Sequence, residues 1–386
     1  MIDVRRRSPV GVLPTTPAAA LPAAGTLGRH TAGQLLRLCQ VAGLGDADAA
    51  GYAQVLTTAL GPVAGRPLAL PAASRSFLSD DHTPVEFSLS FEPGRAPSLR
   101  VLLEPGGGAG STARSGREGL RAVRALARRW NFSTDRLDEL EDLFFPLSPR
   151  GPLALWLALE LRPGGVPRVK VYLNPAASGA DRSAGTVREA LRRLGHPRAF
   201  DALPESDRVL FFALDLGDWD VPRVKVYTAH NELSATAAGR LSRMPGGARP
   251  AEFEAFFRTA SGLDEDQDTL LDRRPVQGCH AFTEAETGLP GGFTLYVPVR
   301  DYVRHDGEAL ERASALLRHY GADPAQLLDS VAAVTSRRPE DGTGLIAYLA
   351  LAHQTGRPPR VTVYISSEAY RVRPPAALSP RAEAAR

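Results

Sequence analysis

The sequence predicts an α+β fold, a ten-stranded antiparallel β-barrel that encloses a central cavity and is surrounded by α-helices in five ααββ repeats. Three observations support this fold. A two-faced strand occurs three times, as VPRVKVYLNP at 166–175, VPRVKVYTAH at 221–230 and PPRVTVYISS at 358–367. Five segments have the alternating apolar residues and the Gly-, Pro- or Asp-rich turns of β-hairpins. Helical stretches separate the hairpins, so the order helix, helix, strand, strand repeats five times.

The elements follow one another regularly along the chain. Two helices are expected within 31–60, before the first hairpin at 85–105. The later hairpins are expected at 152–175, 208–230, 279–299 and 344–366. The helices between them are expected within 117–145, 184–195, 250–273 and 307–337. These elements define one folded domain at 29–373, with a disordered Pro- and Ala-rich leader at 1–28 and a disordered tail at 374–386.

The composition excludes several classes of protein. The 386 residues carry a formal net charge of +3, which is too small to indicate nucleic-acid binding by itself. No apolar run is long enough to span a membrane, and no apolar core of a signal peptide follows the basic N-terminus. Cys39 and Cys279 are the only cysteines, which indicates a reduced, cytoplasmic protein without disulfides or a thiolate metal site. We expect small-molecule substrates, no nucleic-acid or membrane partner, and a monomer or homodimer.

The repeated strand has one apolar face and one polar face. Alternate residues of a strand share a face, so Val169 and Val171 lie opposite Arg168 and Lys170. If the apolar face packs on the helices, the polar face lines the interior, and a barrel of ten strands is wide enough to hold a cavity. The three copies therefore predict a polar chamber.

The distribution of lysine supports a functional chamber. Of the 46 basic residues only Lys170 and Lys225 are lysines, and both occupy the same position of the repeated strand. Lysine and arginine differ in hydration, size and titration. Two lysines at equivalent positions of an arginine-rich chain indicate that these positions need an ammonium group.

Two sets of side chains are expected to face the chamber. The first contains six cations, Arg100, Arg168, Lys170, Arg223, Lys225 and Arg360. Buried cations require anions, and six of them around one cavity indicate a multiply charged ligand such as a diphosphate. The second set is Tyr172, Tyr227, Tyr296 and Tyr364. Their ring faces each attract a cation by roughly 0.5–2 kcal/mol, so the two sets together suit the ionisation of an allylic diphosphate.

These strands, together with DDHTPVEFSLSF at 80–91, resemble the bacterial aromatic (indole) prenyltransferases of the dimethylallyltryptophan synthase family. The resemblance covers most of the chain, from residue 30 to residue 372, and implies the ABBA fold, also called the PT barrel. It implies that Glu86 accepts the indole N–H. The implied diphosphate ligands are Arg100, Lys170, Arg223, Lys225, Arg360 and Thr294, and Thr294 stands where the family pattern leads us to expect Gln or Lys. The implied carbocation shield is Tyr172, Tyr227, Tyr296, Tyr348 and Tyr364, and we expect Phe77, Leu78 and Trp156 to line the aromatic acceptor site.

The resemblance implies a Friedel–Crafts alkylation that transfers a dimethylallyl group from dimethylallyl diphosphate to the indole of L-tryptophan, with C6 as the expected ring position. Either Lys170 or Glu86 is the expected base, and no metal or other cofactor is expected. An Asp-rich DEDQD run at 264–268 and a Gly-rich run at 106–116 are read as loops, because neither has the context of a metal or phosphate motif. Two alternatives remain at this point: another aromatic acceptor, such as a cyclic dipeptide, tyrosine or a phenol, or a non-catalytic barrel that binds an anionic metabolite.

Overall fold

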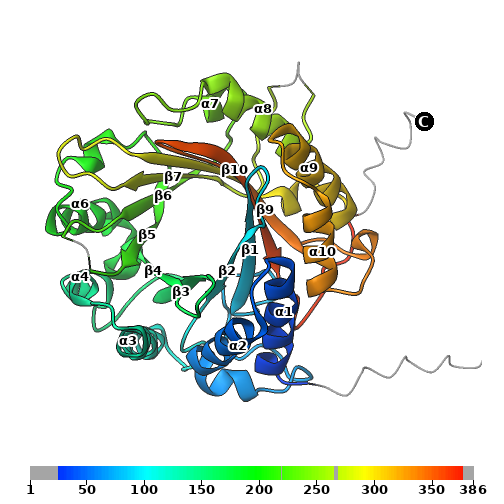
Figure 1. Ribbon diagram of the computed structural model, residues 1–386. Coiled ribbons are helices and arrows are strands. Elements are labelled where there is room, and N and C mark those ends of the chain that lie inside the picture. Colours follow the sequence, from blue (N-terminus) through cyan, green and yellow to red (C-terminus); the bar gives the residue numbers. More distant parts are fainter. Residues whose placement is uncertain (1–24, 219, 265–267, 377–386) are drawn as a thin grey trace, which may run out of the picture.

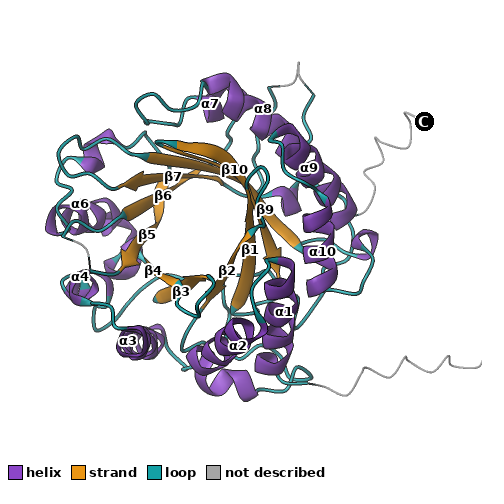
Figure 2. Ribbon diagram, viewed as in Figure 1, coloured by secondary structure: helices purple, strands orange, loops and turns teal. Residues whose placement is uncertain are grey.

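The fold is seen in a computed structural model, which describes residues 25–218, 220–264 and 268–376. Ten antiparallel strands close into a barrel in the order β1-β10-β9-β8-β7-β6-β5-β4-β3-β2. The strands form the inner ring of the molecule and the helices the outer ring (Figures 1 and 2). The predicted α+β barrel and its five hairpins are therefore confirmed. Within the described residues no helix combines the length and the apolar composition needed to cross a membrane.

The strands agree closely with the predicted hairpins. The first three pairs are β1 Val85–Phe91 and β2 Ser98–Leu103, β3 Leu155–Glu160 and β4 Arg168–Leu173, and β5 Arg208–Leu216 and β6 Val224–His230. The last two pairs are β7 Val276–Phe282 and β8 Gly292–Val297, and β9 Ile346–Gln354 and β10 Arg357–Ser366. Gly164 and Gly165 in the turn between β3 and β4 both have positive φ, 92° and 72°, a conformation that glycine adopts without strain.

The helices cover the outside of the barrel in chain order. They are α1 Leu27–Val41, α2 Asp46–Leu60, α3 Thr112–Trp130, α4 Asp135–Asp138, α5 Glu141–Phe144, α6 Ser183–Arg193, α7 Ala235–Gly239, α8 Pro250–Ser261, α9 Asp306–His319 and α10 Ala325–Val334. Short 3-10 helices lie at η1 Gly61–Gly65, η2 Pro175–Ser178, η3 Ala180–Arg182, η4 Ala199–Ala202, η5 Val299–Asp301 and η6 Pro339–Asp341.

The helix predicted at 184–195 is present as α6 Ser183–Arg193, whereas the helical stretch predicted at 250–273 is shorter than expected. Between β4 and β5 the only α-helix of the described chain is α6, with 3-10 turns on both sides, because prolines and glycines interrupt the flanking segments. The predicted helical stretch at 250–273 ends as a helix at Ser261. Beyond it, Leu271 makes an antiparallel bridge to Leu233, with Leu271 N–H donating to Leu233 O at 3.0 Å, so this segment is extended instead. The partner of α8 is the five-residue helix α7.

The folded domain extends a few residues beyond the predicted 29–373. Leu27 begins α1 and is fully buried. At the other end, Pro374 O accepts a hydrogen bond from Thr343 Oγ1 at 2.8 Å, and Ala376 N–H donates to Arg304 O at 2.8 Å. Residues 1–24 of the expected leader and 377–386 of the expected tail lie outside the described residues.

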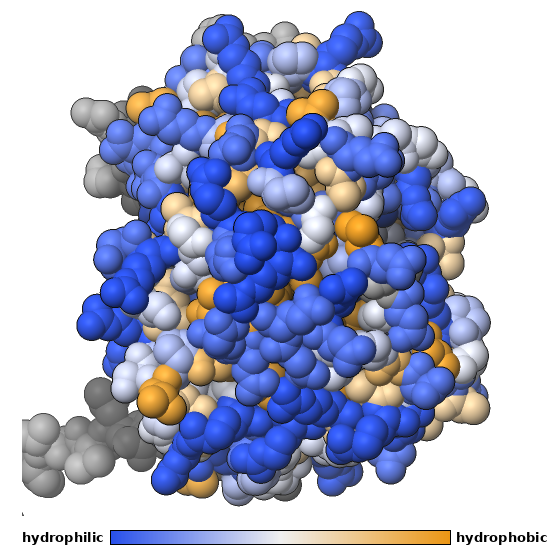
Figure 3. All heavy atoms as spheres, turned by 90° about the vertical axis from the view of Figure 1, so that its left-hand side faces the viewer, coloured by the Kyte–Doolittle hydropathy of each residue, from blue (hydrophilic) through white to orange (hydrophobic). Residues whose placement is uncertain are grey.

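The hydrophobic core lies between the barrel and the helices. Val169, Val171 and Leu173 are at most 4% exposed and belong to this core. The alternate residues of β4 therefore face the barrel interior, as predicted. The outer surface shown in Figure 3 is mostly hydrophilic, with apolar residues in small separate groups. Cys39 and Cys279 are both buried and free.

Candidate active site

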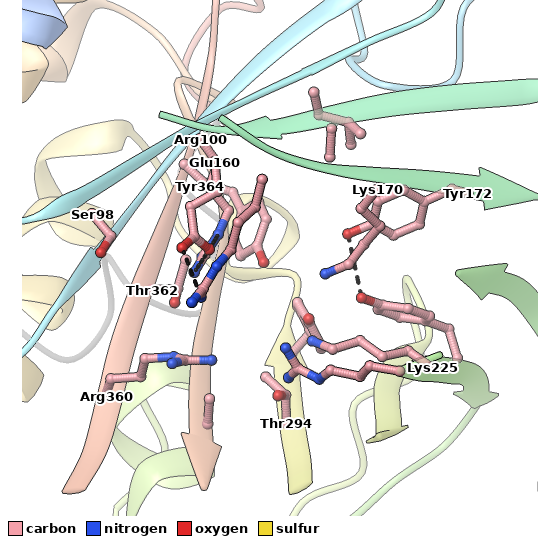
Figure 4. A pocket seen from close by; sticks show the side chains of 18 of the residues that line it. Ser98, Arg100, Glu160, Lys170, Tyr172, Lys225, Thr294, Arg360, Thr362 and Tyr364 are labelled. Atoms are coloured by element: carbon pink, nitrogen blue, oxygen red, sulfur yellow. Dashed lines mark hydrogen bonds and ion pairs between the residues drawn. The ribbon is translucent and has the colours of Figure 1, made fainter. Parts of the chain in front are cut away.

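A chamber of about 950 Å³, part of it open to solvent, lies inside the barrel. Its lining includes all six predicted diphosphate ligands, namely Arg100, Lys170, Arg223, Lys225, Thr294 and Arg360. Arg168 and Arg357 add two cations at the mouth, and the side chain of Arg168 is 55% exposed. The terminal nitrogens of Arg100, Lys170, Lys225 and Arg360 point into one common space from different strands (Figure 4). We call these residues, with Arg223, the cation cluster.

Arg100 on β2 is held by two neighbouring strands. Its Nε donates to Glu160 Oε2 on β3 at 3.0 Å, and its Nη1 donates to Ser90 Oγ on β1 at 2.7 Å. Ser90 Oγ lies 2.7 Å from Thr362 Oγ1 of β10, which continues this network across the strand pair that closes the barrel. Burial would raise the pKa of Glu160, but the Arg100 guanidinium outweighs burial and lowers that pKa to about 2. Arg100 is thus fixed in place before any ligand arrives.

On the opposite wall, Lys170 pairs with a carboxylate that the sequence analysis did not predict. Lys170 Nζ lies 3.1 Å from Asp215 Oδ1, and Arg223 Nη1 lies 3.5 Å from Asp215 Oδ2. Lys225, by contrast, makes no hydrogen bond or ion pair with any described residue. Burial and the charge of Lys170 hold the pKa of Lys225 well below its usual value. Burial also lowers the pKa of Lys170, although Asp215 partly offsets the effect.

The predicted tyrosines form a girdle next to the cation cluster. The ring centroids of Tyr172 and Tyr227 are 5.5 Å apart, those of Tyr227 and Tyr296 5.9 Å, and those of Tyr296 and Tyr364 5.7 Å. Tyr348 continues the girdle, with its ring centroid 6.4 Å from that of Tyr364, but it does not line the chamber itself. Burial raises the pKa of Tyr364 to about 12 and that of Tyr227 well above its usual value. The girdle therefore offers neutral ring faces rather than nucleophilic phenolates.

Glu86 on β1 lies beyond the girdle from the cation cluster. It shares the inner face of β1 with Ser88 and Ser90 and pairs in register with Ser366 of β10. It is 6% exposed and makes no hydrogen bond or ion pair with any described residue. Burial raises the pKa of Glu86 to about 8, and this is the net result after the nearby charge of Arg300 lowers it. Such a carboxyl group is suited to accept a hydrogen bond from a ligand N–H.

Arg300 and Asp80 form a charged pair near Glu86 that the sequence analysis missed. Arg300 is only 3% exposed, and its Nε lies 3.5 Å from Asp80 Oδ2. Its guanidinium carbon lies 5.0 Å from the ring centroid of Tyr348. Asp80 also contacts Arg274 at 3.1 Å and Arg373 at 3.6 Å, so its charge is shared among three arginines. The pair lies outside the repeated strands, and for that reason the alternation pattern gave no signal for it.

The three predicted acceptor-wall residues differ in position. Trp156 is buried on the inner face of β3, with its ring centroid 5.0 Å from that of Phe211. Leu78 is 4% exposed and packs in a small cluster with Leu153 and Trp156. Phe77 is 58% exposed, and none of the three residues is among those that line the chamber, so their role in acceptor binding stays a prediction. Adjacent residues of a loop commonly point in different directions, and the sequence did not indicate which of the two faced inward.

Among the described residues, no group of three or more His, Cys, Asp or Glu side chains is placed to hold a metal ion. Part of the DEDQD run lies outside the described residues.

Comparison with known proteins agrees with this geometry. Residues 29–328 match the family described as tryptophan dimethylallyltransferase. The chain is 63% identical to prenyltransferase PriB in its ternary complex with L-tryptophan and dimethylallyl thiolodiphosphate, with a TM-score of 0.90 over 92% of this chain and 100% of that chain. It is 64% identical to 5-dimethylallyl tryptophan synthase from Streptomyces coelicolor in complex with DMASPP and Trp, with a TM-score of 0.88 over 93% and 100%. It is 41% identical to 6-dimethylallyltryptophan synthase from Micromonospora olivasterospora with the same ligands, with a TM-score of 0.83 over 91% and 99%.

Proposed function

The chain belongs to the tryptophan dimethylallyltransferase family, and from this premise we propose that it transfers a dimethylallyl group from dimethylallyl diphosphate to the indole ring of L-tryptophan by a metal-independent Friedel–Crafts alkylation. The observation that carries the proposal is the order of groups inside the barrel. The cation cluster comes first, the tyrosine girdle second and the buried Glu86 third. An ionising allylic diphosphate and an indole need these three environments in this order.

The cation cluster promotes ionisation of the donor. Arg100, Lys170, Lys225 and Arg360 converge on the space in which we place the diphosphate, and Arg223 belongs to the same lining. As the C–O bond of the donor breaks, negative charge grows on the departing diphosphate, and these prearranged cations stabilise it. They supply the positive charge that a divalent ion supplies in many diphosphate-using enzymes, which supports transfer without a metal. Thr294 contributes only a short hydroxyl to this set.

The girdle stabilises the dimethylallyl cation. The ring faces of Tyr172, Tyr227, Tyr296 and Tyr364 surround the position next to the diphosphate. Ring faces attract a desolvated cation by roughly 2 kcal/mol or more each. Because the hydroxyl groups stay neutral, they do not trap the cation as an ether. The same rings exclude water, which would otherwise yield dimethylallyl alcohol.

Glu86 positions the acceptor. When it is ionised, the Glu86 carboxylate accepts the indole N–H, orients the ring and makes it more electron-rich as the new C–C bond forms. The ring proton at the alkylated carbon then leaves, and the indole regains aromaticity. Lys170 and Glu86 are the two candidate bases, and they lie on opposite sides of the girdle. Transfer that persists in Lys170→Met would assign the proton to Glu86, whereas its complete loss with normal diphosphate binding would assign it to Lys170.

We propose C6 as the ring position, with C5 as the second candidate. The similar proteins include synthases of both kinds, and the 5-synthase has the higher identity of the two, 64% against 41%. The ring position depends on how Trp156 and its neighbours hold the indole against the cation.

The test is one incubation of the purified protein with dimethylallyl diphosphate, L-tryptophan and excess EDTA, read by mass spectrometry. We expect a product heavier than tryptophan by one C5H8 unit, and NMR of that product identifies the ring carbon. Release of diphosphate without a tryptophan product would indicate that the acceptor is another aromatic compound and not L-tryptophan. No consumption of the diphosphate by folded protein would refute the proposed reaction.

A further inference from the structure

The cation cluster contains a carboxylate whose position suggests a role in ligand exchange. Asp215 lies on β5 and is the direct cross-strand partner of Lys170 on β4. Its backbone N–H donates to Arg223 O at 3.1 Å, so Asp215 and Arg223 also face each other at the end of the β5–β6 hairpin. The side chain is 20% exposed and contributes to the wall at the mouth of the chamber.

Asp215 contacts two of the cations that a diphosphate would need. Its Oδ1 is 3.1 Å from Lys170 Nζ, and its Oδ2 is 3.5 Å from Arg223 Nη1. Burial opposes ionisation, but the charges of Lys170 and Arg223 outweigh it, so the pKa of Asp215 is lowered and the carboxylate is charged. Before a ligand binds, therefore, Asp215 provides the negative charge that two partly buried cations require.

The opposite side of the cluster is arranged differently. Glu160 holds Arg100 through a hydrogen bond at 3.0 Å, and Ser90 holds the same guanidinium at 2.7 Å. A guanidinium has five N–H donors in a rigid fork, so Arg100 keeps donors for a ligand while it stays anchored. The ammonium of Lys170 is a compact charge on a flexible stem, so it can move from one acceptor to another.

From this arrangement we propose that Asp215 is a built-in counter-ion of the donor site. Its carboxylate holds Lys170 and Arg223 while the site is empty, and the ammonium of Lys170 turns to the diphosphate when that ligand binds. On release of the product the contact between Lys170 and Asp215 forms again and helps to displace diphosphate. Asp215 is thus a positioning residue that lowers affinity for diphosphate and speeds its departure. The inference rests on the proposed function only in taking diphosphate as the ligand of the cluster.

The first test measures the binding of inorganic pyrophosphate by calorimetry, in the presence of EDTA. Asp215→Asn keeps the shape of the side chain but removes the competing charge, so pyrophosphate should bind about five- to tenfold more tightly, with a steeper dependence on salt. Asp215→Glu should restore binding close to that of the wild type. The control is Asp201→Asn, which removes an equal charge from an exposed ion pair with Arg188 and should change nothing. Equal or weaker binding by folded Asp215→Asn would overturn the proposal.

The second test uses the fact that Lys170 and Lys225 are the only lysines of the chain. In protein made with ¹⁵N-labelled lysine, NMR of the ammonium groups reports on the active site alone. In the empty wild type, the Lys170 ammonium signal should be protected from exchange by Asp215, and it should shift when pyrophosphate is added. In Asp215→Asn the signal of the empty protein should broaden through exchange with water, and pyrophosphate should restore it.

A Lys170 signal that stays fixed while that of Lys225 responds to pyrophosphate would also refute the exchange. This measurement needs only the wild-type protein, so it decides the matter even if Asp215→Asn does not fold. Both tests are independent of turnover. If pyrophosphate behaves as expected but no prenyl group reaches tryptophan, the proposed function fails and the counter-ion role stands.

Discussion

The guanidinium carbon of Arg300 lies 5.0 Å from the ring centroid of Tyr348, so a buried cation covers the last ring of the tyrosine girdle. The same guanidinium lies near Glu86 and lowers its pKa, while the Asp80 carboxylate raises it. The charge state of Glu86, on which we propose that acceptor binding depends, is therefore adjusted by two residues that are not part of the chamber lining.

Opposite pH shifts should follow from removing these two charges. Arg300→Met should raise the pKa of Glu86, because it removes a positive charge, and Asp80→Asn should lower that pKa, because it removes a negative charge. We would measure kcat/KM for L-tryptophan against pH, which reports ionisations of the free enzyme. The control is Arg338→Met, because the Arg338 side chain is 78% exposed and its loss should leave the pH profile unchanged. Profiles that move in the same direction in both variants would contradict this coupling.

Glu86→Gln should separate the two halves of the site. The amide keeps the size of the carboxyl group but loses the charge that favours the indole N–H, so we expect kcat/KM for tryptophan to fall about 100-fold. Binding of inorganic pyrophosphate should stay unchanged, because the cation cluster lies on the other side of the girdle. If Glu86→Gln transferred prenyl groups at the normal rate, the assigned role of Glu86 would be wrong.

Glu86 also makes folding stability depend on pH. Its pKa is about 8 in the folded protein and starts from a value of 4.5 without burial. Between these values the folded state holds a proton that the unfolded state has released, so unfolding becomes more favourable as pH rises. The wild type should therefore lose free energy of unfolding relative to Glu86→Gln as pH rises from 5 to 8. Urea titrations at several pH values test this, and parallel curves for the two proteins would refute it.

The girdle should tolerate loss of a hydroxyl group better than loss of a ring. Tyr364→Phe keeps the ring face, so kcat should stay within about threefold of the wild type. Tyr364→Leu removes about 1 kcal/mol of cation stabilisation, so kcat should fall about fivefold. Rates at saturating substrates would be compared, with diphosphate inhibition as the control for an intact cation cluster. A larger effect for Phe than for Leu would show that the hydroxyl group, rather than the ring, is what matters.

Binding of diphosphate should draw a proton onto Lys225. Burial and the Lys170 charge hold its pKa well below the usual value in the empty site, and a diphosphate beside it raises that pKa. At pH values between the two pKa values, binding takes up a proton. Pyrophosphate calorimetry in two buffers of different ionisation enthalpy measures this uptake, and Lys225→Met should abolish it. Lack of uptake throughout the neutral and alkaline range would show that Lys225 is already charged in the empty site.

The sequence was sufficient to predict the barrel and its polar interior because both follow from local patterns. A hairpin is defined by neighbouring residues, and the alternation of Val169 and Val171 with Arg168 and Lys170 sets the inner face directly. The cation cluster and the girdle were found for this reason. The roles assigned to their residues stay predictions.

The features that the sequence analysis missed depend on contacts between distant segments. Asp215 and Glu160 lie on the first strands of their hairpins, where one acidic residue in an apolar run gives no sign of its partner. Arg300 meets Asp80 only because the barrel closes. The extended segment at Leu271 is fixed by its bridge to Leu233, which overrides the local helical pattern.

The pairing of β1 with β10 has a consequence for synthesis of the protein. The first and last strands of the described residues are neighbours, so Glu86 meets Ser366 only after β10 has been synthesised and has left the ribosome. Until then the growing sheet has two unpaired edges, and such edges readily join those of other chains. Nascent or prematurely terminated chains should therefore depend on chaperones more than the finished protein does. A ribosome pause before codon 357 would prolong this vulnerable state, since β10 begins at Arg357.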